Sequence, residues 1–97
     1  ADLGQVIIEG FLGDIPAQIE KLKEFVQSGD TAGATRQAHT IKGASANVGA
    51  PALRQAAATL EEMGHADDLA GMADSISLLE AEFGRLKSVL TGLKAHG

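Results

Sequence analysis

Apolar residues recur every three or four positions along nearly the whole chain, which is the spacing of amphipathic helices. Hydrophobic residues make up 44% of the sequence and are mostly Ala, Leu, Ile and Val, whereas only three residues, all Phe, are aromatic. This pattern predicts an all-α fold. The 97 residues suffice for one hydrophobic core, so we expect a single domain over residues 1–97.

The first apolar stretch, over residues 6–26, is interrupted at Gly13, Asp14 and Pro16. Asp is a favoured N-cap residue and Pro suits the first turn of a helix. The pattern therefore predicts a short first helix and a second helix that begins near Asp14. The segment 28–30 (Ser-Gly-Asp) is expected to end the second helix and to cap the third.

The third helix is predicted over about residues 30–48, and its core-facing positions are Ala34, Ala38, Ile41, Ser45 and Val48. Gly49, Ala50 and Pro51 then place a glycine after one helix and a proline at the start of the next. The fourth helix is expected to end at Gly64. Because the connection at 49–51 is short, the third and fourth helices should be antiparallel neighbours.

The last helix, capped by Asp67 or Asp68, has the longest apolar stripe in the chain. Its spacing fits a long bundle helix or a coiled-coil seam. We therefore predict an antiparallel up-and-down four-helix bundle with a short extra helix at the N-terminus. The stripe consists of Leu69, Met72, Ile76, Leu79, Phe83, Leu86, Leu90 and Leu93.

The charge balance limits the classes of partner. Asp and Glu total 13 against 8 Lys and Arg, a formal net charge of -5, which argues against nucleic acid or anionic lipid as a partner. The chain has no cysteine, as is usual in a reducing compartment, and no apolar run approaches the roughly 18 residues of a membrane span. We expect a cytoplasmic protein that binds neither nucleic acid nor membrane.

The third helix carries the residues with the clearest chemistry. His39, Lys42 and Gly43 are spaced i, i+3 and i+4, so they share one face of the helix, beside the core face. Folding the hairpin about position 50 places His39 level with Glu61 of the fourth helix, and Lys42 level with residues 57–58. The sequence therefore predicts an imidazole next to a carboxylate and an ammonium group.

This arrangement suits a nucleophilic imidazole. A carboxylate at Glu61 that accepts the Nδ1–H of His39 leaves the lone pair on Nε2, the nitrogen that can attack. Lys42 can neutralise phosphoryl oxygens, and Arg36 can add to the positive field. Gly43 leaves space for a partner to approach. A single histidine near a helical core face is more often a packed residue without such a role, and the spacing alone leaves that interpretation open.

Residues 38–50 read A-H-T-I-K-G-A-S-A-N-V-G-A, and Leu53, Leu60 and Glu61 follow. This combination resembles the signature of histidine-containing phosphotransfer domains of two-component phosphorelays. The resemblance implies that His39 is phosphorylated on Nε2, that Lys42 stabilises the phosphate and that Glu61 orients the imidazole. It also implies that Gly43 gives a partner access; with Arg36 and Ala46, it should form the docking surface.

The function that the resemblance implies is a phosphorelay intermediate. His39 would accept a phosphoryl group from the aspartate of one receiver domain and pass it to the aspartate of another. The expected partners are response-regulator receivers and a sensor or hybrid histidine kinase. We expect the chain to be a monomeric phosphocarrier rather than an enzyme, with no cofactor of its own, because the receiver would supply magnesium and most catalytic groups.

Other functions remain open at this stage. A chemotaxis-kinase-type phosphotransfer domain would receive phosphate directly from a kinase ATP-binding domain. A non-phosphorylated helical interaction module would instead pair with a partner through the 69–93 seam. The other histidines look less functional, because His65 follows a helix-ending glycine and fits a solvated cap or turn, and His96 lies in the tail. Their spacing does not suit a zinc site.

Overall fold

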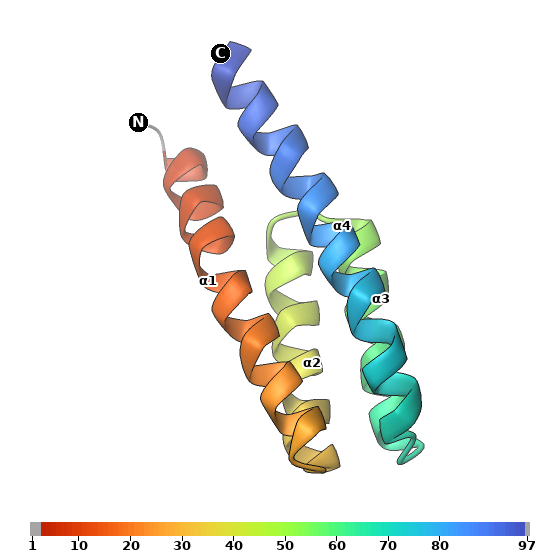
Figure 1. Ribbon diagram of the computed structural model, residues 1–97. Coiled ribbons are helices and arrows are strands. Elements are labelled where there is room, and N and C mark those ends of the chain that lie inside the picture. The colour runs from red at the N-terminus through yellow and green to blue at the C-terminus, as the bar shows by residue number, and fades with distance from the viewer. Residues whose placement is uncertain (1–2, 97) are drawn as a thin grey trace.

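The computed structural model describes the backbone of residues 3–96 and the side chains of residues 3–92. It contains α1 (Leu3–Gln27), α2 (Thr31–Asn47), α3 (Pro51–His65) and α4 (Leu69–His96). Successive helices run in opposite directions, so the start of α1 and the end of α4 lie at the same end of the molecule (Figure 1). Both α1 and α3 pack against α2 and α4. The predicted antiparallel four-helix bundle is therefore confirmed.

The separate short N-terminal helix was a wrong prediction, because α1 is continuous through Asp14 and Pro16. Pro16 lacks an amide hydrogen, and a proline inside a helix costs about 3 kcal/mol. Burial on both sides of the proline offsets that cost. Phe11, on its N-terminal side, is 7% exposed, and its ring lies 6.4 Å from that of Phe83. Ile15 is also buried on that side, and the buried face continues beyond the proline through Ile19 and Leu22.

The three connections share one turn geometry. Gly29, Gly49 and Asp67 have φ angles of 77°, 69° and 57°, in the left-handed region. After each helix the same two hydrogen bonds close the turn. At the end of α2, for example, the Gly49 amide donates to the Ala46 carbonyl (3.1 Å) and the Ala50 amide to the Ser45 carbonyl (2.9 Å). This pairing is the Schellman motif, which lets the chain reverse within a few residues.

Two of the helices that follow these turns, α2 and α4, begin with an aspartate N-cap. The amide of Gly33 donates to Asp30 Oδ1, and the amide of Gly71 donates to Asp68 Oδ1, both at 2.9 Å. Of the two candidate caps for the last helix, Asp68 thus fills the position. The remaining junction, between α2 and α3, has Pro51 at the start of α3 and no side-chain cap. The helix ends predicted at residues 28–30, at 49–51 and at Gly64 are therefore close to those observed.

The apolar stripe of the last helix faces the core. Met72, Ile76, Leu79 and Phe83 are buried, and Leu69 and Leu86 pack against them. The stripe thus belongs to the bundle interior over these positions, while the side chain of Leu93 lies outside the described residues. The remaining core residues are Phe11, Ile15, Ile19, Leu22, Ala34, Ala38, Ile41, Ala50, Leu53, Ala56, Ala57 and Leu60.

The bundle is elongated, with extents of 44 × 20 × 19 Å. At one end α1 and α4 continue past the shorter hairpin of α2 and α3 (Figure 1). Within residues 3–96, no helix combines the length and the apolar character that crossing a membrane would require. The hairpin of α2 and α3 forms one side of the bundle and carries the candidate site.

Candidate functional site

The position of His39 follows from the narrow apolar face of α2. Ala34, Ala38, Ile41 and Ser45 are buried, as predicted, and they hold that face against the core. His39 lies one residue beyond Ala38, about 100° around the helix, so its ring leaves the core. Its side chain is 66% exposed. The imidazole is therefore anchored on a rigid helix and accessible to another molecule.

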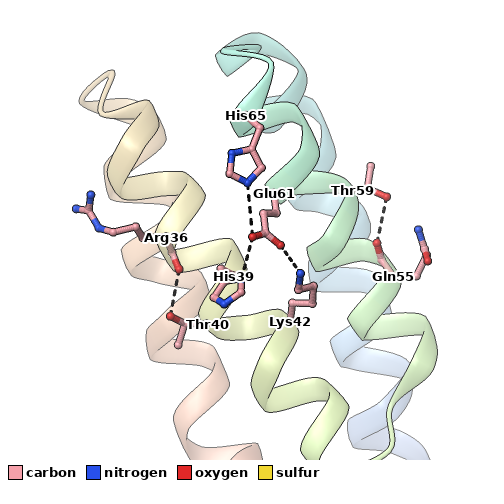
Figure 2. A network of polar contacts seen from close by, with 8 residues as sticks. All are labelled: Arg36, His39, Thr40, Lys42, Gln55, Thr59, Glu61 and His65. Atoms are coloured by element: carbon pink, nitrogen blue, oxygen red, sulfur yellow. Dashed lines mark hydrogen bonds and ion pairs between the residues drawn. The ribbon is translucent and has the colours of Figure 1, made fainter.

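Glu61 is the centre of a polar network that joins α2 and α3 (Figure 2). Its Oε2 lies 2.8 Å from His39 Nδ1, and its Oε1 lies 2.6 Å from Lys42 Nζ. The Nε2 of His65 is 3.7 Å from the same Oε2. The Glu61 side chain is only 14% exposed, so one largely covered carboxylate faces three basic side chains.

The charge state of Glu61 determines the tautomer of His39. The hydrogen bond from Lys42 is the main cause that lowers the pKa of Glu61 below its usual value of 4.5. Partial burial acts in the opposite direction, and the hydrogen bond with His39 adds to the lowering. At neutral pH the carboxylate is therefore ionised and can only accept hydrogen bonds. It follows that Nδ1 of His39 carries the hydrogen, and Nε2 of the neutral ring carries the lone pair.

Small residues let α2 and α3 approach closely beside this network. Gly64 is buried, and a Cβ atom added to it would lie 2.0 Å from Thr35 Oγ1 and 2.9 Å from Thr35 Cβ. Both distances are too short for real atoms, so no larger residue fits without movement. Gly64 lies one turn after Glu61, and Thr35 lies one turn before His39. The close contact at this point therefore helps to set the spacing between His39 and Glu61.

Gly43 has the opposite surroundings. It is exposed, and a Cβ atom at this position would meet no other atom within 4 Å. Packing within the described chain therefore does not require a glycine here. Gly43 lies one turn from His39 on the open side of α2, and Ala46, the next residue along this face, is also exposed. The surface beside the imidazole is therefore smooth and made of small residues.

Arg36 does not join the network around Glu61. Figure 2 shows its side chain extending away from the carboxylate. Arg36 and His39 nevertheless border the same open hollow, which is lined by α2 from Thr31 to Thr40, by α3 from Glu61 to His65, and by Asp67. The positive charge of Arg36 is therefore close to the surface on which His39 is exposed.

The geometry agrees with the hairpin register inferred from the sequence, with two differences. His39 and Glu61 are in contact, as that register predicts. Lys42 was expected level with residues 57–58, but its long side chain reaches Glu61, one turn further on. His65 was expected to be a solvated cap or turn residue. It is the last residue of α3 and is 69% exposed, and its ring turns towards Glu61, a contact that the i, i+4 spacing could have suggested.

A comparison with protein families identifies the class of this arrangement. The family model described as Hpt domain matches residues 6–95, nearly the whole chain. The chain belongs to the Hpt domain family. Hpt domains are phosphocarriers of two-component signalling, which act by histidine phosphotransfer and normally interact with response-regulator receivers and kinases. Comparisons with curated proteins and with solved structures found no match.

Proposed function

We propose that this Hpt domain is a phosphorelay intermediate that uses His39 as its phosphorylated residue. It takes a phosphoryl group from the aspartate of one receiver domain and delivers it to the aspartate of another. The main support is the bond between His39 Nδ1 and Glu61 Oε2, 2.8 Å long, on an imidazole that is 66% exposed. This bond directs the lone pair to Nε2 and leaves that nitrogen free for a partner.

In the forward step, the Nε2 lone pair of His39 attacks the phosphorus of the aspartyl phosphate. A bond forms between nitrogen and phosphorus, the bond between phosphorus and the aspartyl oxygen breaks, and the aspartate leaves as a carboxylate. The proton on Nδ1 stays in place, and Glu61 stabilises the positive charge that the ring acquires. The second transfer reverses these steps on another receiver, so no net proton transfer is required.

Lys42 and the small residues of α2 have separate tasks in this proposal. Lys42 Nζ, held by Glu61 at 2.6 Å, is on a flexible stem and can turn to the phosphoryl oxygens when they arrive. Gly43 and Ala46 leave room for the receiver, and Arg36 adds positive charge near its acidic site. The receiver supplies magnesium and most catalytic groups. Catalysis then consists mainly of positioning and charge neutralisation.

The experiment is phosphoryl transfer from a phosphorylated receiver domain to the purified chain. We expect a label that acid removes and alkali spares, located on His39 by mass spectrometry. His39→Gln should abolish the label and leave the helical circular dichroism unchanged, whereas His96→Gln is the matched control and should keep it. Labelling of the His39→Gln variant would place the phosphate on another residue.

The source of the phosphate distinguishes this proposal from its closest alternative. Label obtained only with a kinase ATP-binding domain and ATP, and from none of a panel of receivers, would identify a chemotaxis-kinase-type domain. No label from either source would leave a helical module without phosphotransfer. Label from one receiver that a second receiver then removes is the result expected for a relay intermediate.

A further inference from the structure

His65 shares an acceptor atom with His39. The Nδ1 of His39 and the Nε2 of His65 approach the same oxygen, Glu61 Oε2, at 2.8 and 3.7 Å, from α2 and α3 respectively (Figure 2). The shorter contact is a hydrogen bond, while the longer one lies within the range of an ion pair but beyond that of a hydrogen bond. A small movement of the carboxylate towards His65 would therefore strengthen one contact and weaken the other.

The charges around His65 come from three segments. Glu61 lies on its own helix, Arg36 and His39 face it from α2 across the open hollow, and Asp67 borders the hollow in the turn after α3. Asp68 is engaged as the cap of α4. A histidine ring ordinarily gains its charge between about pH 8 and pH 5, where carboxylates stay ionised and arginine stays charged. Lysine, the residue type bound to the other Glu61 oxygen, also keeps its charge in this interval, so histidine is the residue type around Glu61 that ordinarily changes charge there.

Protonation alters what His65 can do. A neutral ring at 3.7 Å competes weakly for Oε2, whereas an imidazolium donates from both nitrogens and is attracted by the carboxylate. A glutamate that precedes a cation by four residues is also the favourable order for an ion pair on a helix. The charged form of His65 should therefore shorten its contact with Oε2 at the expense of the bond to His39 Nδ1.

We propose that His65 is a positioning residue that, when protonated, competes with His39 for Glu61 Oε2 and thereby weakens phosphoryl acceptance by His39 at acidic pH. The inference rests on the proposed function, because it concerns the readiness of the same Nε2. When Glu61 loses its hold on Nδ1, the neutral ring of His39 exchanges to the tautomer with hydrogen on Nε2. That tautomer has no lone pair at the attacking atom.

The first test measures the tautomers of His39 directly, by nitrogen-15 NMR of the ring nitrogens between about pH 8 and pH 5. In the wild-type chain we expect the ratio of the Nδ1–H to the Nε2–H form of neutral His39 to fall by about two- to fivefold, the factor typical of one exposed charge pair. His65→Gln removes the titrating charge, and the ratio should then stay constant. His65→Lys keeps a charge throughout and should lower the ratio already at about pH 8.

The three chains also have distinct phosphotransfer profiles. Relative to His65→Gln, wild type should accept phosphate from a receiver at the same rate near pH 8 and about two- to fivefold more slowly near pH 5.5. His65→Lys should be slower at both values. Because His65 is 69% exposed, these substitutions leave the core intact, and circular dichroism checks this.

Two results would overturn the inference. In the first, the tautomer ratio of His39 depends on pH in the same way in wild type and in His65→Gln. In the second, the ratio in His65→Lys at about pH 8 equals that of wild type. The NMR measurement requires no phosphate, so it tests the role of His65 even if no receiver labels the chain. A failure of labelling would refute the proposed function alone. Conversely, normal labelling with equal tautomer ratios in all three chains would refute only the role of His65.

Discussion

Gly43 and Gly64 offer a matched pair of substitutions whose effects on stability should have opposite signs. Both are helical, and alanine in place of glycine in an exposed helix interior is worth about 1 kcal/mol. Gly43→Ala adds its methyl group to open space, so this gain should appear in full. Gly64→Ala places the methyl 2.0 Å from Thr35 Oγ1, and overpacking of that kind costs about 1–3 kcal/mol. After the gain of about 1 kcal/mol is subtracted, we expect a net destabilisation of up to about 2 kcal/mol.

Urea unfolding followed by circular dichroism measures both changes, and about 1 kcal/mol corresponds to a Tm shift of about 4–8 °C for a domain of this size. Thr35→Ala provides the internal control. It removes the atom at 2.0 Å and leaves only Cβ at 2.9 Å, so in that background Gly64→Ala should cost at least about 1 kcal/mol less. If Gly64→Ala stabilised the chain as much as Gly43→Ala, or if its cost did not depend on Thr35, the close contact would not limit the helix spacing.

Three further results are expected. Lys42→Ala should slow phosphotransfer about tenfold or more, since one charge-assisted contact to the phosphoryl group is worth about 1.5–3 kcal/mol; an unchanged rate would remove its role. Gly43→Leu should block receiver docking in a binding assay although the helix becomes more stable, and normal transfer would contradict the access argument. Glu61→Gln should lower the free energy of unfolding above pH 4.5, because the lowered pKa of Glu61 means that its ionised form stabilises the fold. The difference in stability from wild type should disappear as the pH falls through the lowered pKa, and acid unfolding of both chains would show this.

Helix positions were well determined by the sequence where local signals and burial agree. The glycine after α2, the proline that opens α3 and the stripe of α4 all act through the backbone and core in the way that their spacing suggests. The signals at Asp14 and Pro16 were misleading because they are local, whereas the continuity of α1 depends on contacts with other helices. The packing of Phe11 against Phe83 is such a contact, and it joins residues 72 positions apart.

The site could be predicted to the level of helix register. The length of one hairpin suffices to bring residue 39 level with residue 61, and the observed bond between His39 and Glu61 follows from that geometry. The contacts of Lys42 and His65 depend on where long or exposed side chains turn, which the register does not determine. The contact of Gly64 with Thr35 was also not foreseen, because a glycine near a helix end has several possible reasons.

The location of the site on two consecutive helices also affects how the chain folds. His39 and Glu61 are 22 residues apart and are joined by a turn that the left-handed Gly49 closes. Contacts between neighbours in the chain cost little loop entropy and are associated with fast folding. The contact between α1 and α4 joins helices from the two ends of the chain, and it involves no residue of the network around Glu61. Assembly of the polar network therefore requires the closure of one helical hairpin, and it does not depend on the two ends of the chain finding each other.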